Sequence, residues 1–208
     1  AVTKAYVDDA AAPEGFSSGD MQYWDGTAWV LIQAPGDNAK MLSFCAGVPY
    51  WTDLGCLAIG DTGPAGGIVF YITDGGAHGL EAALADQGIN AEWGCYGTLI
   101  AGADGTTVGT GAQNTADIVA GCDSSPDNAA EITDAYELNG YSDWFLPSRD
   151  ELNLLYQQKD VVGGFTNGAY WSSTEYGINE ALDQGFFDGS QGTGDKNFTL
   201  GVRAVRAF

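Results

Sequence analysis

Residues 140–156 read GYSDWFLPSRDELNLLY and place acids, an arginine and a serine close to a tryptophan. Such a group could be a catalytic cluster or the start of a helix. Ser148 and Glu151 have the S-x-x-E spacing of a capping box, in which each side chain satisfies a backbone N–H in the first helical turn. The apolar face of this helix would comprise Leu152, Leu155 and Tyr156. The stretch predicts a capped helix, and catalysis is not needed to explain its polar residues.

The composition predicts a turn-rich fold with a sizeable core. The chain has 208 residues, of which 45% are hydrophobic and 12% aromatic, enough for one large domain or a domain with a small appendage. It contains 31 glycines and only 17% charged residues, which favours short strands over long charged helices. Seven basic residues face 28 acidic ones, and the formal net charge of -21 argues against nucleic acid and anionic membranes as partners.

The cysteine pattern indicates an oxidising compartment. Four cysteines permit three pairings, and we favour Cys45–Cys56 with Cys95–Cys122 because each pair encloses a short glycine-containing segment. Free buried thiols are the alternative. There is no C-x-x-C motif, and His78 is the single histidine, which together argue against a zinc site.

The sequence shows neither a membrane-spanning segment nor a signal peptide. No apolar run approaches the ~18–20 residues that a membrane-spanning helix needs, and we expect no membrane insertion. Residues 1–15 lack the hydrophobic stretch of a signal peptide, so we expect a mature or trimmed chain. A strand near residues 199–208 should close the sheet and complete the C-terminus.

Residues 1–60 predict a small β-rich segment. The stretch 19–32 alternates around Asp25-Gly26, a dipeptide typical of tight hairpin turns, and residues 41–56 repeat the pattern. The side chains expected to share faces across the first hairpin are Met21, Tyr23, Trp29 and Leu31. Because the segment has few residues for a core of its own, we expect it to pack on the main domain or on copies of itself.

A second domain is predicted from residue 61 to residue 208, after the glycine-rich boundary GDTGPAGG at residues 60–67. GGIVFYIT predicts its first strand. One helix should end near Gly121, and another should end at Gly140, the usual C-terminal glycine. The last third predicts strands joined by glycine-rich turns.

No known catalytic or cofactor motif is present. The chain lacks G-x-S-x-G, a dinucleotide or phosphate-binding glycine loop and the EF-hand pattern. Asp183 and Asp188 could bind calcium together with loop carbonyls, so calcium is the one cofactor left open and any metal ligands stay unknown. We predict that the chain is not an enzyme.

The seven basic residues form no convincing patch in a single copy. Arg203 and Arg206 alternate with apolar positions near the C-terminus, which predicts structural ion pairs. Lys159 follows the capped helix and Lys196 lies in a Gly/Asp turn, so both are expected to be exposed.

Five stretches together resemble the C-terminal domain family of Legionella collagen-like adhesins: GGIVFYITDGGAHGLEAA, EWGCYGT, NGYSDWFLPSRDELNLLYQQKDVVGGF, YWSSTE and VRAVRAF. The resemblance covers about residues 64–208. It implies a C-type-lectin-like α+β domain with short twisted strands and a few short helices, preceded by the small β-rich segment. It also implies an extracellular protein of the bacterial cell surface, trimeric beyond a collagen-like stalk, that binds sulfated glycosaminoglycans in attachment, aggregation and biofilm formation.

In related lectin-like receptors the ligand face lies between the WSS strand and the final strand. The ligand-binding residues predicted here are Arg149, Lys159, Tyr176, Gln191, Lys196 and Asn197. In a trimer the basic residues would recur threefold, and a cluster could act despite distant acids because salt screens beyond ~8–10 Å. The alternatives are a calcium-assisted lectin or protein-receptor binder using residues 176–197, a trimerisation cap for a stalk, and an enzyme of the formylglycine-generating or hydrolase type. The last lacks a plausible nucleophile–base pair.

Overall fold

The computed structural model describes residues 20–35, 40–52, 54–122 and 127–208. In this part of the chain strands predominate, with four short α-helices, so the fold class is α+β as predicted. The strands are β1 (Met21–Trp24), β2 (Trp29–Ile32), β3 (Met41–Cys45), β4 (Val48–Thr52), β5 (Ile68–Thr73), β6 (His78–Ala82), β7 (Gly88–Glu92), β8 (Ala169–Glu175), β9 (Glu180–Gly185), β10 (Gln191–Asp195), β11 (Thr199–Val202) and β12 (Val205–Ala207). The helices are the 3-10 turn η1 (Asp74–Gly76) and α1 (Gly111–Gly121), α2 (Ala129–Asp134), α3 (Arg149–Gln157) and α4 (Lys159–Val162).

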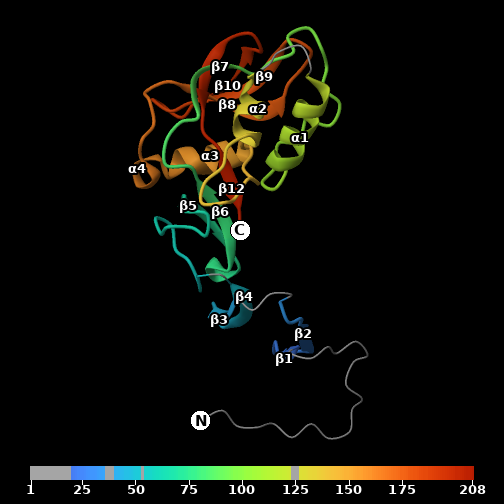
Figure 1. Cartoon of the computed structure of the whole chain (residues 1–208), viewed down its shortest axis with the longest axis vertical. Coiled ribbons are helices and arrows are strands. Elements are labelled where there is room, and N and C mark those ends of the chain that lie inside the picture. Colours follow the sequence, from blue (N-terminus) through green and yellow to red (C-terminus); the bar gives the residue numbers. More distant parts are fainter. Residues whose placement is uncertain (1–19, 36–39, 53, 123–126) are drawn as a thin grey trace, which may run out of the picture.

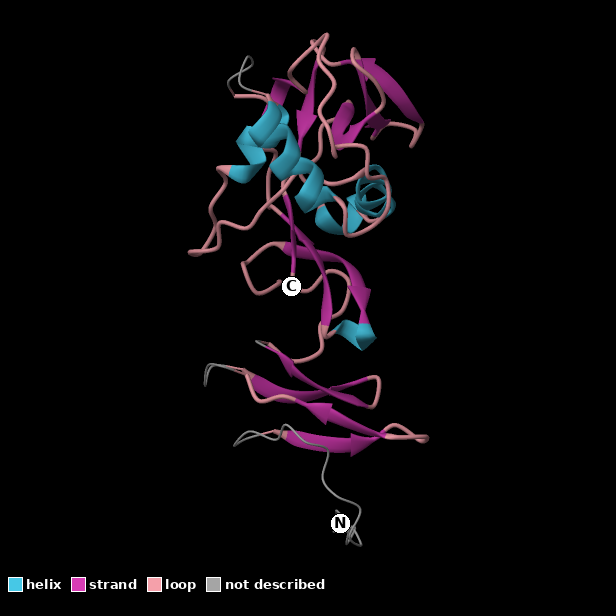
Figure 2. Cartoon of the chain, turned by 90° about the vertical axis from the view of Figure 1, so that its right-hand side faces the viewer, coloured by secondary structure: helices cyan, strands magenta, loops and turns pink. Residues whose placement is uncertain are grey.

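Two sheets with helices between them make up the larger part of the molecule. The five-stranded sheet has the order β10-β9-β8-β11-β7, in which β8 and β11 are parallel and the other pairs antiparallel. The three-stranded sheet has the order β12-β6-β5. Figure 2 shows the helices between these sheets, and Figure 1 shows β1–β4 at the opposite end of the molecule from β7, β9 and β10. Because β11 and β12 belong to different sheets, the last residues join both layers.

The core lies on both sides of the helical layer. The cluster beside α1 and α2 includes Trp93, Ile118, Leu146, Trp171 and Val202. The cluster around α3 includes Phe70, Leu152, Leu155, Tyr170 and Phe186. Each such side chain contributes about 1.5–3 kcal/mol by leaving water, and together they fix the position of α3 relative to both sheets.

The capping box that the sequence predicts is present at the start of α3. The Ser148 hydroxyl accepts a hydrogen bond from the Glu151 amide, and the Glu151 Oε2 accepts one from the Ser148 amide at 2.7 Å. The other carboxylate oxygen of Glu151 accepts from the Gly109 amide at 2.7 Å. The cap therefore also holds the loop before α1 against α3.

Arg203 and Arg206 form the structural ion pairs that the sequence predicts. Arg203 lies 2.7 Å from Asp86 and donates to the carbonyls of Ala83 and Gly164. It stands between β11 and β12, into which the expected terminal strand is divided. Arg206 contacts Glu81, whose buried carboxylate also accepts the amides of Ala65 (3.0 Å) and Gly67 (2.9 Å). The boundary segment 60–67 is thus fastened to the C-terminal strand.

The first hairpin forms, but its predicted faces are wrong. Asp25 Oδ1 accepts hydrogen bonds from the amides of Thr27 and Ala28, which makes a four-residue turn and pairs Trp24 with Trp29. Odd residues of one strand therefore oppose even residues of the other. The face expected for Met21, Tyr23, Trp29 and Leu31 is replaced by one with Met21, Tyr23, Val30 and Ile32.

The second hairpin, β3–β4, is fastened to the larger domain. Disulfides join Cys45 to Cys56 and Cys95 to Cys122, the pairing expected from the sequence. The Leu57 amide donates to the Gly76 carbonyl at 2.8 Å, which anchors the segment after β4 on η1. None of the helices in the described ranges is long and apolar enough to cross a membrane.

Helix α2 ends earlier than predicted. Asn128 caps its start through the amides of Ala130 and Glu131, and the helix ends at Asp134. Gly140 is not its C-terminal glycine. Asn139 (φ 52°) and Gly140 (φ 84°) are the two central residues of a tight turn between Leu138 and Tyr141.

Replacing Ser148 by Ala should lower the free energy of unfolding by about 0.5–2 kcal/mol, because the cap of α3 is lost. Urea unfolding followed by circular dichroism measures the change. Ser142→Ala, at an exposed position of the same stretch, is the matched control and should leave the midpoint unchanged. Equal effects of the two variants would contradict the role of the cap.

Candidate functional site

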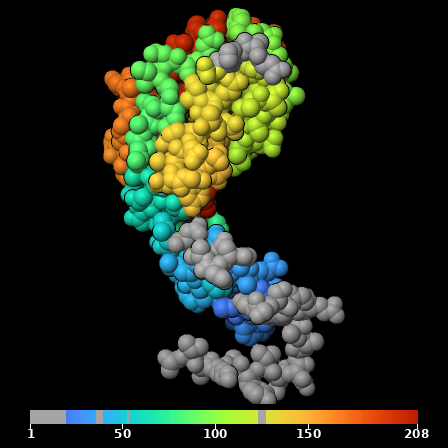
Figure 3. Space-filling view, in the orientation of Figure 1, coloured from blue at the N-terminus to red at the C-terminus, as the bar shows by residue number. Residues whose placement is uncertain are grey.

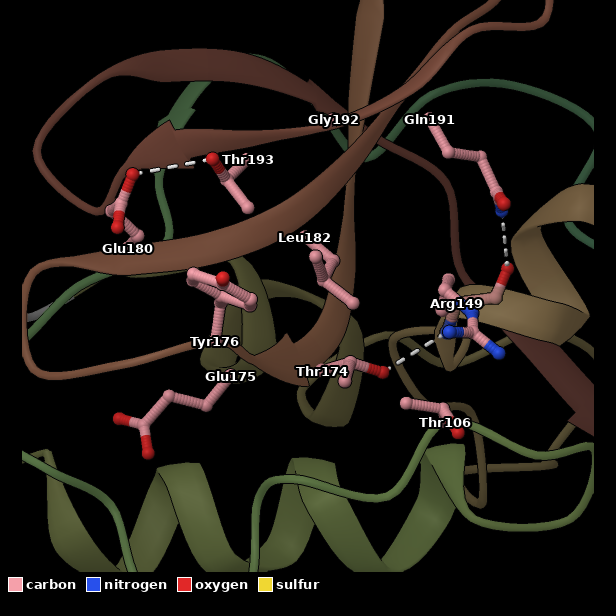
Figure 4. Close-up of a pocket in the computed structure, with 10 residues that line it drawn as sticks. All are labelled: Thr106, Arg149, Thr174, Glu175, Tyr176, Glu180, Leu182, Gln191, Gly192 and Thr193. Carbon is pink, nitrogen blue, oxygen red and sulfur yellow. Dashed lines mark hydrogen bonds between the residues drawn. The ribbon is translucent and has the colours of Figure 1, made fainter.

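An open groove lies between the start of α3 and strands β8–β10. Its volume is about 850 Å³. Figure 4 shows Arg149 and Gln191 at one end, Glu180 and Thr193 at the other, and Tyr176 with Leu182 between them. The full lining comprises Thr106, Arg149, Thr174, Glu175, Tyr176, Glu180, Leu182, Gln191, Gly192 and Thr193. The structure therefore brings together Arg149, Tyr176 and Gln191 of the predicted ligand-binding residues.

Arg149 supplies the positive end of the groove. Its amide donates to Thr174 Oγ1 at 3.0 Å, which positions the first turn of α3 beside the end of β8. Its side chain is 38% exposed, and its guanidinium lies 2.8 Å from Asp150. The side-chain amide of Gln191 donates to the Arg149 carbonyl at 3.4 Å. An anionic group entering here would meet a guanidinium that a neighbouring carboxylate already partly neutralises.

The remainder of the groove carries hydroxyls, an aromatic ring and the carboxylates of Glu175 and Glu180. Thr193 donates to Glu180 Oε1 at 3.2 Å, and Thr174 donates to the Gly105 carbonyl at 2.7 Å. Tyr176 is 66% exposed and offers an open aromatic face. Hydroxyls, an amide and an aromatic ring are groups that bind sugar hydroxyls and the apolar faces of sugar rings.

The expectation that Lys196 is exposed is wrong. Its side chain is fully buried and its ammonium forms an ion pair with Glu175, donates to the Thr98 carbonyl at 2.8 Å and lies 4.6 Å from the centre of the Trp93 ring. The same Glu175 oxygen accepts the Ile100 amide at 2.9 Å. A ligand in the groove has no access to the Lys196 ammonium in this structure, so Lys196 acts on the groove through Glu175 beneath it.

Lys159 and Asn197 lie outside the groove. Lys159 is half-buried, donates to the Phe186 carbonyl at 2.7 Å and lies over the Tyr156 ring. It lines a separate depression of about 360 Å³ beside Gly163, Gly164 and Phe165. Asn197 is exposed in the turn between β10 and β11. Within one copy of the described chain, Arg149, Lys159 and Lys196 do not gather into a cluster.

Sequence reasoning missed the hydroxyl lining of the groove. Trp171, Ser172 and Ser173 of the YWSSTE stretch are buried, as expected for fold determinants, and Ser172 donates to the Leu182 carbonyl at 2.8 Å. Thr174, the next residue, is also buried but contributes to the wall of the groove. A change of register between Trp171 and Glu175 turns this part of the strand, and the alternation of residues alone does not reveal it.

Asp183 and Asp188, the two acids considered as calcium ligands, lie in different environments. Burial raises the pKa of Asp183, whereas hydrogen bonds from the Ser190 amide and hydroxyl lower the pKa of Asp188. In the part of the chain that the structure describes, no three His, Cys, Asp or Glu side chains gather in a way that could hold a metal ion. Calcium binding stays a prediction.

Comparison with known protein families shows which family contains the groove. Residues 95–206 match the Lcl C-terminal domain, a stretch that includes α3 and all the strands that line the groove. The chain belongs to the Lcl C-terminal domain family. This family is associated with adhesins and is not a known enzyme family. Among curated proteins, none matches the chain.

Replacing Lys196 by Met should lower the free energy of unfolding by about 3–5 kcal/mol, because Glu175 would keep a buried charge without its partner. Chemical denaturation of the two proteins measures the change. Lys159→Met is the matched control, since the Lys159 side chain keeps part of its solvent contact and pairs with a neutral carbonyl. A loss for Lys196→Met no larger than that for the control would contradict the structural role of the buried pair.

Proposed function

We propose that this chain is the ligand-binding part of a secreted or surface-exposed bacterial adhesin and that the groove binds a glycan. The observation that carries the proposal is the lining of the groove: threonine hydroxyls, the Gln191 amide and the exposed ring of Tyr176, with Arg149 at one end. Membership of an adhesin-associated family and two disulfides support a location outside the cytoplasm.

The ligand that we propose is a sulfated glycosaminoglycan or a similar polysaccharide. Arg149 is the cation available to a sulfate in the groove, and guanidinium groups bind such oxyanions through paired N–H donors. Because the net charge is -21 and Lys196 is buried, one copy offers few other positive charges to a dense polyanion. The ligand should therefore be held mainly through sugar hydroxyls and ring faces, with one anionic group at Arg149. Attachment, aggregation and biofilm formation are the roles that such binding would serve.

We also propose a C-type-lectin-like fold for the domain. In support, β5 and β12, the first and last strands of the domain, both pair with β6 in one sheet, so the domain begins and ends in the same place. The groove lies on the other sheet, at the opposite side of the helical layer.

The proposed assembly is a homotrimer joined through β1–β4. These hairpins expose Trp24, Trp29, Met41 and Phe44, whose exposed fractions run from 46% to 65%. Large apolar side chains gathered on small sheets favour burial against another copy. A trimer would present three copies of Arg149 to one polysaccharide chain and raise the apparent affinity without new contacts.

Heparin binding by the full chain tests the proposal. Arg149→Gln should weaken binding by about tenfold or more, because a hydrogen bond to a charged group is lost. Added salt should weaken the binding of the unmodified protein in the same direction. Calorimetry or surface plasmon resonance measures both, and light scattering of the same samples gives the oligomeric state.

The controls separate the alternatives. Lys159→Gln, outside the groove, should leave heparin binding nearly unchanged. A chelator should have no effect, and loss of binding in its presence would favour the calcium-assisted lectin. If Arg149→Gln still binds neutral dextran, the groove remains a glycan site, and the proposal that the ligand is sulfated is rejected. Absence of binding to either polysaccharide would contradict glycan recognition altogether, and a monomer in light scattering would contradict the trimer.

A further inference from the structure

Three loops meet at the end of the molecule furthest from β1–β4. They are residues 94–99, residues 176–179 and residues 195–198. The Gly97 amide donates to the Ile178 carbonyl at 2.9 Å, and the Lys196 amide donates to the Asn179 carbonyl at 2.8 Å. In the space-filling view the green and red segments that contain the first and third loops form this end (Figure 3).

Each loop exposes large apolar side chains. Tyr96 and Leu99 come from the first loop, Ile178 from the second and Phe198 from the third, with exposed fractions of 51–63%. We call these four residues the apolar tip. Tyr176, on the second loop, belongs both to the edge of the tip and to the groove. Soluble proteins seldom gather exposed apolar side chains on adjacent loops unless the surface binds a partner.

The backbone beneath the tip is held in place from inside. The buried Lys196 ammonium bonds the Thr98 carbonyl and Glu175, and the Glu175 carboxylate bonds the Ile100 amide. The Cys95–Cys122 disulfide fastens the first loop to the end of α1. A surface that is already ordered loses little conformational entropy on binding, which favours recognition.

The acidic residues around the apolar tip indicate the charge that a partner should carry. Glu92, Glu180 and Asp195 lie on the strands that lead into the three loops, and each keeps solvent contact. Lys196 is the only basic residue within the three loops, and it is buried. An apolar surface with an acidic rim is complementary to an apolar surface with a basic rim.

We propose that the apolar tip is a docking surface for a protein partner that presents aliphatic or aromatic side chains within a basic surface. Leu99 and Ile178 offer no hydrogen bond and no ring face to a sugar, so the tip suits a protein better than a glycan. Anionic bilayers are disfavoured by the acidic rim. This surface adjoins the glycan site at Tyr176, but its four residues lie outside the groove lining, and the proposal does not depend on glycan binding.

Binding of defined helical peptides to the full chain tests the proposal. The probe is an amphipathic Leu/Lys peptide, compared with a Lys/Ser peptide of equal charge and a Leu/Glu peptide of equal apolar face. Fluorescence anisotropy should show binding of the Leu/Lys peptide alone. Ile178→Ser combined with Phe198→Ser should weaken it by about tenfold or more, because the burial of two large apolar side chains is lost.

Matched variants make the result specific. Leu84→Ser combined with Val161→Ser alters two side chains of similar exposure (54% and 49%) outside the three loops and should leave the affinity unchanged. Arg149→Gln should also leave it unchanged, so failure of the glycan proposal and of this one can be told apart. Equal binding of the Lys/Ser peptide, equal loss in both double variants, or binding to zwitterionic lipid vesicles with loss in the tip variant only would overturn the proposal.

Discussion

The buried ion pair between Lys196 and Glu175 is the interaction on which the functional end of the molecule depends. Removing an ammonium and a carboxylate from water is costly, so such a pair persists only when the remaining polar atoms are also satisfied. Here the ammonium reaches the Thr98 carbonyl and the Trp93 ring, and the carboxylate reaches the Ile100 amide. These contacts join three segments of the chain beside the groove, and Tyr176, next in sequence to Glu175, lines the groove.

The capping box of α3 constrains the other side of the groove in a comparable way. Glu151 bonds the Ser148 and Gly109 amides at once, so it holds both the helix and the loop before α1. Burial raises the pKa of this carboxyl even though the hydrogen bonds from both amides oppose the shift. The cap fixes the first residue of the helix, Arg149, where its amide meets Thr174. One buried carboxylate, that of Glu175, thus lies in the wall of the groove, and another, that of Glu151, holds the helix beside it.

The features that could be predicted from the sequence are those set by residues close together in the chain. The capping box depends on residues three apart, and β3–β4 depends on a two-residue turn at Ala46-Gly47, whose positive φ angles suit a tight hairpin. Arg203 and Arg206 could be assigned to ion pairs because charged residues within an alternating apolar strand need partners. The α+β class was implied by the resemblance to the adhesin family.

Features that depend on distant residues were not predictable in this way. The partners of Lys196 are Trp93, Thr98 and Glu175, which precede it by 21 to 103 residues. Its local sequence, a glycine-containing turn, indicated exposure because none of these partners is nearby in the chain. The first hairpin was assigned the wrong faces because the side-chain bonds of Asp25 set the length of the turn. The lining of the groove depends on a register change in β8 that the alternation of residues does not encode.

Amide hydrogen exchange of the loop over the buried pair tests the central claim most directly. The amides of Gly97 and Ile100 bond across to Ile178 and Glu175, so they should exchange as slowly as the amide of Ser173, which bonds to the Pro147 carbonyl in the core. Such protection would show that the pair holds the three loops as one unit. Exchange of Gly97 and Ile100 at the rate of unbonded surface amides, with Ser173 still protected, would contradict the account.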